Sequence, residues 1–254
     1  MSLSLLGAFG AAFLAGLVNS IAGGGSLISF PILMLLGLPP VVANATNTAG
    51  IWSGSVGSMW GFREELRRLP RQIFWLLIPS VVGGLFGAGV LRHTPAVVFA
   101  RLVPWLIVMA TLLFLLRERL QKRLRSVEAA RHQGARWLTI ALGIQLLLAI
   151  YGGFFGAGVS IMMLAVLGLL GMTDIFEMSA TTSMLSCAIN GVAGIYFTAA
   201  GLVAWNFVPV MAVGAVCGGF VAVGLARRVG KKAVRYFVIG VGLTTATVMF
   251  IRLL

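Results

Sequence analysis

Charged side chains are scarce in this sequence of 254 residues. Asp, Glu, Lys and Arg make up 10% of it, against roughly 25% in a soluble globular domain. Apolar residues make up 59%, and the mean hydropathy is +1.03. A soluble fold would have too little polar surface to cover itself, and a disordered chain would be far less apolar. The composition therefore predicts an all-α polytopic membrane protein, because helices satisfy their own backbone in lipid.

Groups that carry catalysis or bind metals are also few. The two cysteines, Cys187 and Cys217, lie within apolar segments, where a free cysteine is usually a small packing residue. Four of the six acids lie in basic loops. The other two, Asp174 and Glu177, precede an apolar run, which favours a helix cap over a proton relay. No metal-ligand spacing, nucleophile with a base or phosphate-binding loop occurs in the sequence. We predict no enzymatic activity, no cofactor and no metal.

Basic residues, by contrast, number 19, which gives a formal net charge of +13. Sixteen of them fall in three clusters, within Arg63–Arg71, Arg117–Arg136 and Arg227–Arg235. A nucleic-acid binder would carry such residues on a solvated face with aromatic and polar ones. Here they lie between apolar segments, as the positive-inside rule describes for cytoplasmic loops. We predict no nucleic-acid partner, and cytoplasmic loops that face the anionic lipid of the inner leaflet.

Ten apolar segments are predicted as membrane helices. They cover roughly residues 3–22, 26–37, 41–61, 72–91, 96–116, 137–151, 158–171, 175–199, 206–226 and 233–252. The second and the seventh are short. Twelve residues of helix, as in 26–37, span about 18 Å, whereas the hydrocarbon core of a bilayer is about 30 Å thick. These two segments are therefore expected to be half-length helices.

Similar residues recur at an offset of 133 to 135. The matched pairs are Gly23-Gly24-Gly25-Ser26 with Gly156-Ala157-Gly158, Ala45-Thr46-Asn47 with Ala180-Thr181-Thr182, and Gly83-Gly84 with Gly218-Gly219. The offset indicates two transmembrane repeats, residues 1–116 and 137–254, joined by a basic linker over 117–136. The linker is either an amphipathic helix on the inner leaflet or an extension of the preceding span.

The charge distribution predicts how the two repeats are related. If each repeat counts five segments, the second is inverted, and 16 basic residues lie inside against 3 outside. If the short segments are not counted, 12 lie inside and 7 outside. The first arrangement fits the positive-inside rule better. We therefore expect inverted repeats of five helical segments, each with one short helix, and both termini outside.

The glycine-rich end of each short segment is its N-terminal end. Two half-length helices would bring their N–H groups and positive dipole ends toward each other near the midplane, which is an anion-binding geometry. Neutral polar side chains nearby can also bind an anion, although such residues equally join membrane helices to one another. The predicted substrate-binding residues are Asn19, Gly24, Gly25, Ser26, Asn44, Thr46, Asn47, Gly158, Ser160, Thr181, Thr182 and Ser183.

Glycine has two expected roles in this fold. At Gly25 it lets a ligand reach the backbone, so Gly25→Leu is expected to abolish transport and to leave expression intact. A second group of glycines is expected to allow close helix packing. These are Gly83, Gly84, Gly87, Gly218 and Gly219.

Several of these segments resemble the sulfite exporter TauE/SafE family of membrane permeases, over nearly the whole chain. They are Ala22–Ser26 running to Pro31, Leu36–Pro39, Ala43–Asn47, Gly152–Gly158 and Ser179–Ser183. Val159 and Leu164 stand where the family usually has a glycine and a proline.

The resemblance implies export of sulfite, sulfoacetate or related organosulfonates across the cytoplasmic membrane by alternating access. Import, or transport of another small anion, is an alternative. A membrane-embedded enzyme acting on sulfur compounds is another, and it would depend on Cys187. The coupling ion and the oligomeric state, including a homodimer, are left open.

Overall fold

The computed structural model describes residues 3–21, 24–126, 135–169, 172 and 174–221, with positions 240, 243, 244 and 247 beyond them. Regular structure in this part of the chain is entirely helical. The first seven helices are α1 (Leu3–Ile21), α2 (Ser26–Leu35), α3 (Pro40–Gly61), α4 (Arg63–Arg68), α5 (Arg71–Phe74), α6 (Leu77–His93) and α7 (Ala96–Ser126). They are followed by α8 (Ala135–Phe154), α9 (Val159–Leu169) and α10 (Ile175–Ala199), and residues 208–221 are also helical.

The helix bounds confirm most of the predicted segments and correct a few details. Helix α7 continues without a break to Ser126, so residues 117–126 extend the preceding span and do not form a separate helix. The Arg63–Arg71 segment, expected as a loop, contains α4 and the start of α5. Helix α6 ends at His93, two residues beyond the predicted segment 72–91. The linker positions 127–134 and the Arg227–Arg235 cluster lie outside the described residues.

The ends of the short helix α2 and of its neighbours follow from local chain chemistry. After α2, Gly37 has φ +93°, a conformation that favours glycine, and Leu38 N–H donates to Leu33 O in the manner of a Schellman motif. Pro40 then opens α3 as its first residue. At α10 the carboxylate of Asp174 accepts from Phe176 N at 2.7 Å. The predicted cap at Asp174 is therefore confirmed.

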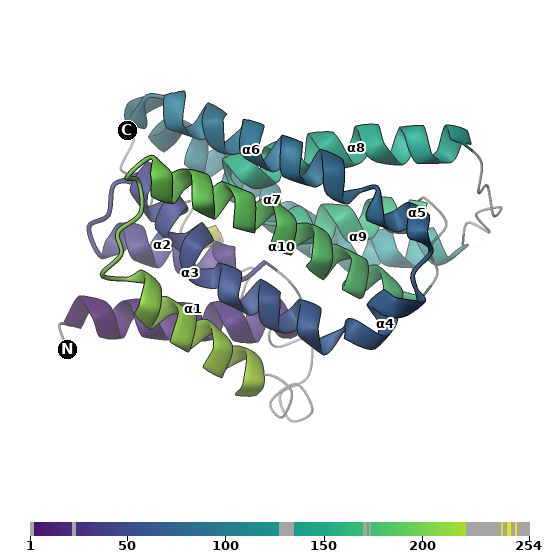
Figure 1. Cartoon of the computed structure of the whole chain (residues 1–254). Coiled ribbons are helices and arrows are strands. Elements are labelled where there is room, and N and C mark those ends of the chain that lie inside the picture. The colour runs from purple at the N-terminus through teal and green to yellow at the C-terminus, as the bar shows by residue number, and fades with distance from the viewer. Residues whose placement is uncertain are drawn as a thin grey trace.

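The helices form one bundle with a common long axis (Figure 1). Helix α10 packs against both α3 and α6, α6 packs along α8, and α7 contacts α2, α3 and α9. Large apolar side chains cover the outside of the bundle, and Ile78, Phe86 and Trp105 are more than half exposed. Residues Arg71–His93 form a stretch of 23 residues that is long and apolar enough to cross a membrane, and its most apolar window of 18 residues has a mean hydropathy of 2.0. Shorter apolar stretches, of 10–17 residues, lie within α1, α2, α7, α8, α9 and residues 208–221.

Glycines allow the closest helix contacts, as predicted. A Cβ added at Gly83 would lie 2.7 Å from Ala149 Cβ, and one added at Gly87 would overlap the carbonyl oxygen of Ile150, both on α8. A Cβ added at Gly84 would lie 3.2 Å from Ile189 Cα on α10. Gly218 approaches the carbonyl oxygen of Phe13 on α1. For Gly219 the role in packing stays a prediction.

We expect Gly87→Leu to destabilise the fold by about 1–3 kcal/mol, because the added side chain has no space against α8. Gly89→Leu is the matched control on the same helix, since the nearest atom to its Cβ is Tyr196 Oη at 3.8 Å. Thermal unfolding in detergent should show a lower midpoint for Gly87→Leu alone. Equal midpoints for the two variants would contradict the packing role of Gly87.

Candidate functional site

The short helix α2 begins inside the bundle at a buried glycine turn. Gly24 has φ +87°, which turns the chain back after α1, and both Gly24 and Gly25 are buried. The N–H of Gly25 donates to Asn19 Oδ1 at 2.7 Å. A neutral side-chain oxygen thus accepts the hydrogen bond of a backbone N–H that the sequence predicts to bind an anion.

Gly25 also has a packing role that the sequence analysis missed. A Cβ at this position would overlap the carbonyl oxygen of Ala15 on α1. The expectation that Gly25→Leu leaves expression intact is therefore wrong, because the substitution would separate α2 from α1. A test of the site needs a residue whose replacement leaves the packing unchanged.

A buried hydrogen bond joins α2 to α3. Ser29 Oγ donates to Asn47 Oδ1 at 2.5 Å, and both side chains are at most 2% exposed. Asn47 is one of the predicted binding residues, whereas Ser29 is not. The signal for Ser29 was weak, because one serine in an apolar helix commonly bonds its own backbone, and Ser29 Oγ also lies 3.4 Å from Gly25 O.

Asn44 connects α3 to the turn that precedes the other short helix, α9. Its Nδ2 donates to Phe154 O at 3.0 Å, and its side chain is 1% exposed. Its Oδ1 is buried and has no hydrogen-bond partner. Next to this bond, the ring of Phe155 meets that of Phe30 from α2 edge to face, with centroids 5.4 Å apart. The two short helices therefore begin close to a shared group of buried side chains.

The turn before α9 is held by its own polar contacts. Gly156 and Gly158 have φ of +76° and +80°. Tyr151 Oη donates to Ala157 O at 2.6 Å, and Asn190 Oδ1 lies 4.0 Å from the position that a Gly156 Cβ would take. Neither Tyr151 nor Asn190 was predicted. The polar Asn190 within the apolar α10 was the available signal.

In the described residues of the second half, no side-chain hydrogen bond joins the positions that correspond to Ser29 and Asn47. Ser160 Oγ lies 3.4 Å from Ser186 Oγ. Thr182 occupies the position of Asn47 at the offset of 135, and Met162 occupies that of Ser29 at the offset of 133. A methionine has no hydroxyl to offer, and Thr182 Oγ1 is buried without a hydrogen-bond partner. The two halves therefore differ at corresponding positions.

Two other predicted residues, Thr46 and Thr181, make contacts away from the two helix starts. Thr46 Oγ1 accepts from Ala204 N at 2.9 Å and so joins α3 to the segment after α10. Thr181 Oγ1 donates to Glu177 O within α10. Ser26 and Ser183 are half-buried. Whether these four residues touch a substrate stays a prediction.

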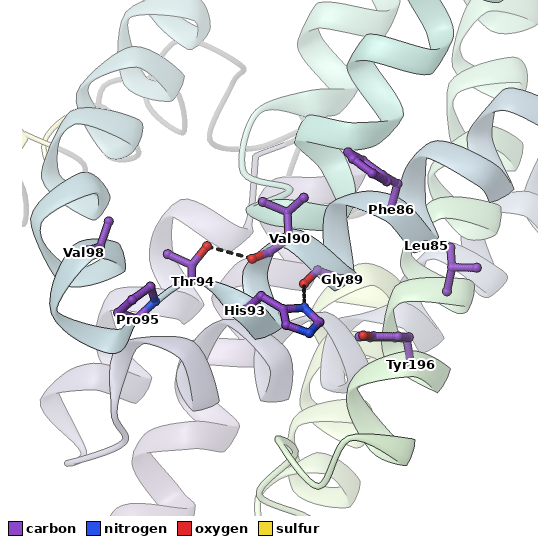
Figure 2. A pocket seen from close by; sticks show the side chains of 9 residues that line it. All are labelled: Leu85, Phe86, Gly89, Val90, His93, Thr94, Pro95, Val98 and Tyr196. Carbon is purple, nitrogen blue, oxygen red and sulfur yellow. Dashed lines mark hydrogen bonds between the residues drawn. The ribbon is translucent and has the colours of Figure 1, made fainter.

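An open groove of about 690 Å³ lies elsewhere, between α6, α7 and α10 (Figure 2). Its lining includes none of the predicted binding residues. Asn44, Asn47 and Thr182 are 1–6% exposed. A ligand can reach these side chains only if the surrounding helices move apart.

Comparison with known proteins confirms the family resemblance over most of the chain. A family model described as sulfite exporter TauE/SafE matches residues 8–249. A probable membrane transporter protein of Haemophilus influenzae is 28% identical over 228 residues, which cover 89% of this chain and 87% of the relative. The probable membrane transporter protein YfcA of Escherichia coli strain K12 is 32% identical over 233 residues, 91% and 84% of the two chains. No solved structure matches significantly.

Replacing Ser29 should show how much the α2–α3 bond stabilises the fold. Ser29→Ala removes the donor and leaves Asn47 Oδ1 buried, so we expect a loss of about 1–3 kcal/mol in the free energy of unfolding. Ser160→Ala, which removes only a long contact at 3.4 Å, is the control and should cost less. Chemical denaturation in detergent measures both, and equal losses would contradict the assignment.

Proposed function

Because this chain belongs to the sulfite exporter TauE/SafE family and is a membrane transporter, we propose that it exports small sulfur-containing anions such as sulfite, sulfoacetate or related organosulfonates. One structural observation carries the proposal. Helices α2 and α9 both begin inside the bundle, at glycine turns with positive φ. A helix start in a membrane interior leaves N–H groups that need acceptors. A small oxyanion supplies them, and the helix dipole favours its charge.

The proposed architecture is a pair of inverted repeats, and the helix bounds support it. Helices α1 and α8 end at Ile21 and Phe154, an offset of 133, and α2 and α9 begin at the same offset. Helices α3 and α10 begin at an offset of 135. Packing is also reciprocal. The glycines of α6 approach α8, and those of residues 208–221 approach α1.

The apolar contacts support opposite directions for the two short helices. Near its C-terminal end, α2 contributes Leu33 to a cluster that includes Phe197, near the end of α10. Near its own C-terminal end, α9 contributes Leu167 to a cluster with Leu69 and with Met178, near the start of α10. Figure 1 shows α2 and α9 at opposite ends of the bundle. Since both helices also begin near the contact between Phe30 and Phe155, we propose that their N-terminal ends are directed toward the interior.

The proposed orientation places the α4–α5 end of the bundle in the cytoplasm. The four arginines of this segment lie at the same end as the start of α10, and we assign the linker of residues 117–136 and the Arg227–Arg235 cluster to the same side. Such a concentration of positive charge raises the local concentration of anions at the inner mouth. It also follows the positive-inside rule.

Alternating access is the proposed mechanism, because the binding groups are buried. In the closed arrangement Asn44 Oδ1 and Thr182 Oγ1 lack partners, and each such group costs free energy. Separation of the helices would expose these groups to water or to the substrate. Binding would then offset part of the cost of opening.

Thr182→Val separates binding from folding, because it removes a buried hydroxyl that has no partner and preserves the shape of the side chain. We expect unchanged or higher stability and a loss of about tenfold or more in sulfite counterflow into proteoliposomes. Thr111→Val is the matched control, since Thr111 Oγ1 is also buried without a partner but lies on α7, outside the predicted set. Equal flux in both variants would exclude Thr182 from the site. Wild-type flux equal to that of empty liposomes would refute the transport proposal itself.

Membrane-impermeant maleimide tests the orientation. In a background without Cys187 and Cys217, a cysteine at exposed Asn206 should be labelled in intact cells. One at exposed Glu64 should be labelled only after permeabilisation. The reverse pattern would place the basic end outside and would contradict the proposed orientation.

A further inference from the structure

The groove between α6, α7 and α10 lies on the outer surface of the bundle. Its apolar walls include Leu85, Phe86, Val90 and Val98, which are 40–61% exposed. In Figure 2, Pro95 and Val98 form one side and Tyr196 lies on the other, with Val90 and His93 between them. Since this exterior faces the acyl chains in a membrane transporter, the groove opens to lipid.

One end of the groove is polar and lies at the end of the bundle, where α6 stops at His93. His93 Nδ1 contacts Gly89 O at 2.8 Å, and because a carbonyl only accepts, Nδ1 carries the proton. This leaves Nε2 for another partner. Thr94 Oγ1 donates to Val90 O at 2.7 Å. The groove therefore combines apolar walls with hydrogen-bonding groups at the depth of a lipid headgroup.

Two arginines flank the same groove. The guanidinium of Arg92 lies 5.9 Å from the ring centroid of Tyr196, a wall residue. Arg101 follows Val98 by three residues on α7, so both lie on one face of that helix. Arg92, Arg101 and Arg252 are the basic residues outside the three clusters. Two of these three therefore lie beside lining residues of one groove, at the end of the bundle that the positive-inside rule leaves poor in positive charge.

We propose that this groove binds an anionic phospholipid. One acyl chain lies along Leu85, Phe86 and Val90, and the phosphate lies beside Arg92 and Arg101. Guanidinium groups form strong paired hydrogen bonds with phosphate, and long basic side chains reach headgroup depth from within the bilayer.

Charge complementarity favours a lipid over a second copy of the chain. A symmetric dimer through this face would bring two sets of Arg92 and Arg101 together. Four of the described acidic residues lie at the other end of the bundle, on α4 and at the start of α10, and they are Glu64, Glu65, Asp174 and Glu177. A fifth, Glu118, lies on α7 at 17 residues beyond Arg101.

Native mass spectrometry of delipidated protein, titrated with phosphatidylglycerol or phosphatidylcholine of the same acyl chains, tests the headgroup. We expect wild type to retain phosphatidylglycerol about tenfold better. The double variant Arg92→Gln and Arg101→Gln should lose that preference, so that the two lipids are retained about equally. The control variant, Arg67→Gln and Arg68→Gln, removes the same charge at the other end of the bundle and should retain the preference for phosphatidylglycerol. Equal retention of both lipids by wild type, or an unchanged preference in the Arg92 and Arg101 variant, would overturn the proposal.

A second pair of variants tests the acyl-chain position. Val90→Trp fills the groove and should lower phosphatidylglycerol retention. Val82→Trp places the same bulk on the exposed surface of α6, outside the lining, and should leave retention unchanged. If Val90→Trp changes the ratio of monomer to dimer and leaves lipid retention unchanged, the occupant is a second copy and the proposal is wrong.

Discussion

The structure depends on one constraint, that a backbone group without a hydrogen-bond partner is costly in a membrane interior. Helices α2 and α9 both start inside the bundle, where the glycine turns supply carbonyl acceptors to some of their first N–H groups, as Gly24 O does to Leu27 N and Gly156 O to Val159 N. At α2 the side chain of Asn19 accepts from Gly25 N. At α9 the preceding turn is held through its carbonyl groups, by Tyr151 and Asn44. These side chains make the interior breaks tolerable and fix their place in the fold.

Close glycine packing and buried polar bonds act together around these breaks. Gly25 lets α2 lie against α1, and Gly153 lets α8 lie against α6. Ser29 and Asn47 then join α2 to α3 by a short bond in the first half. The second half has Met162 and Thr182 at the corresponding positions, and the threonine hydroxyl has no partner. At this pair of positions the first half is thus closed by its own side chains, whereas the second leaves a buried hydroxyl without a partner, and we propose that the substrate bonds to it.

Local signals made much of this fold predictable. Pro39-Pro40, the glycine turns and the apolar runs predicted most helix bounds, because turn chemistry and hydropathy act over a few residues. The Asp174 cap was predictable for the same reason. Contacts between distant residues were not. The bonds of Asn44 to Phe154 O and of Thr46 to Ala204 N join residues 110 and 158 positions apart. The packing role of Gly25 depends on where α1 lies, which no local pattern states.

We propose that an oxyanion binds inside the bundle at the starts of the short helices. Crystals of the protein soaked with selenite, a heavier analogue of sulfite, would test it by anomalous scattering of selenium. We expect a selenium peak within hydrogen-bonding distance of the turn at Gly24–Ser26 or of the turn at Gly156–Ser160. Selenium peaks confined to the arginines of α4 and α5, with none in the interior, would contradict it.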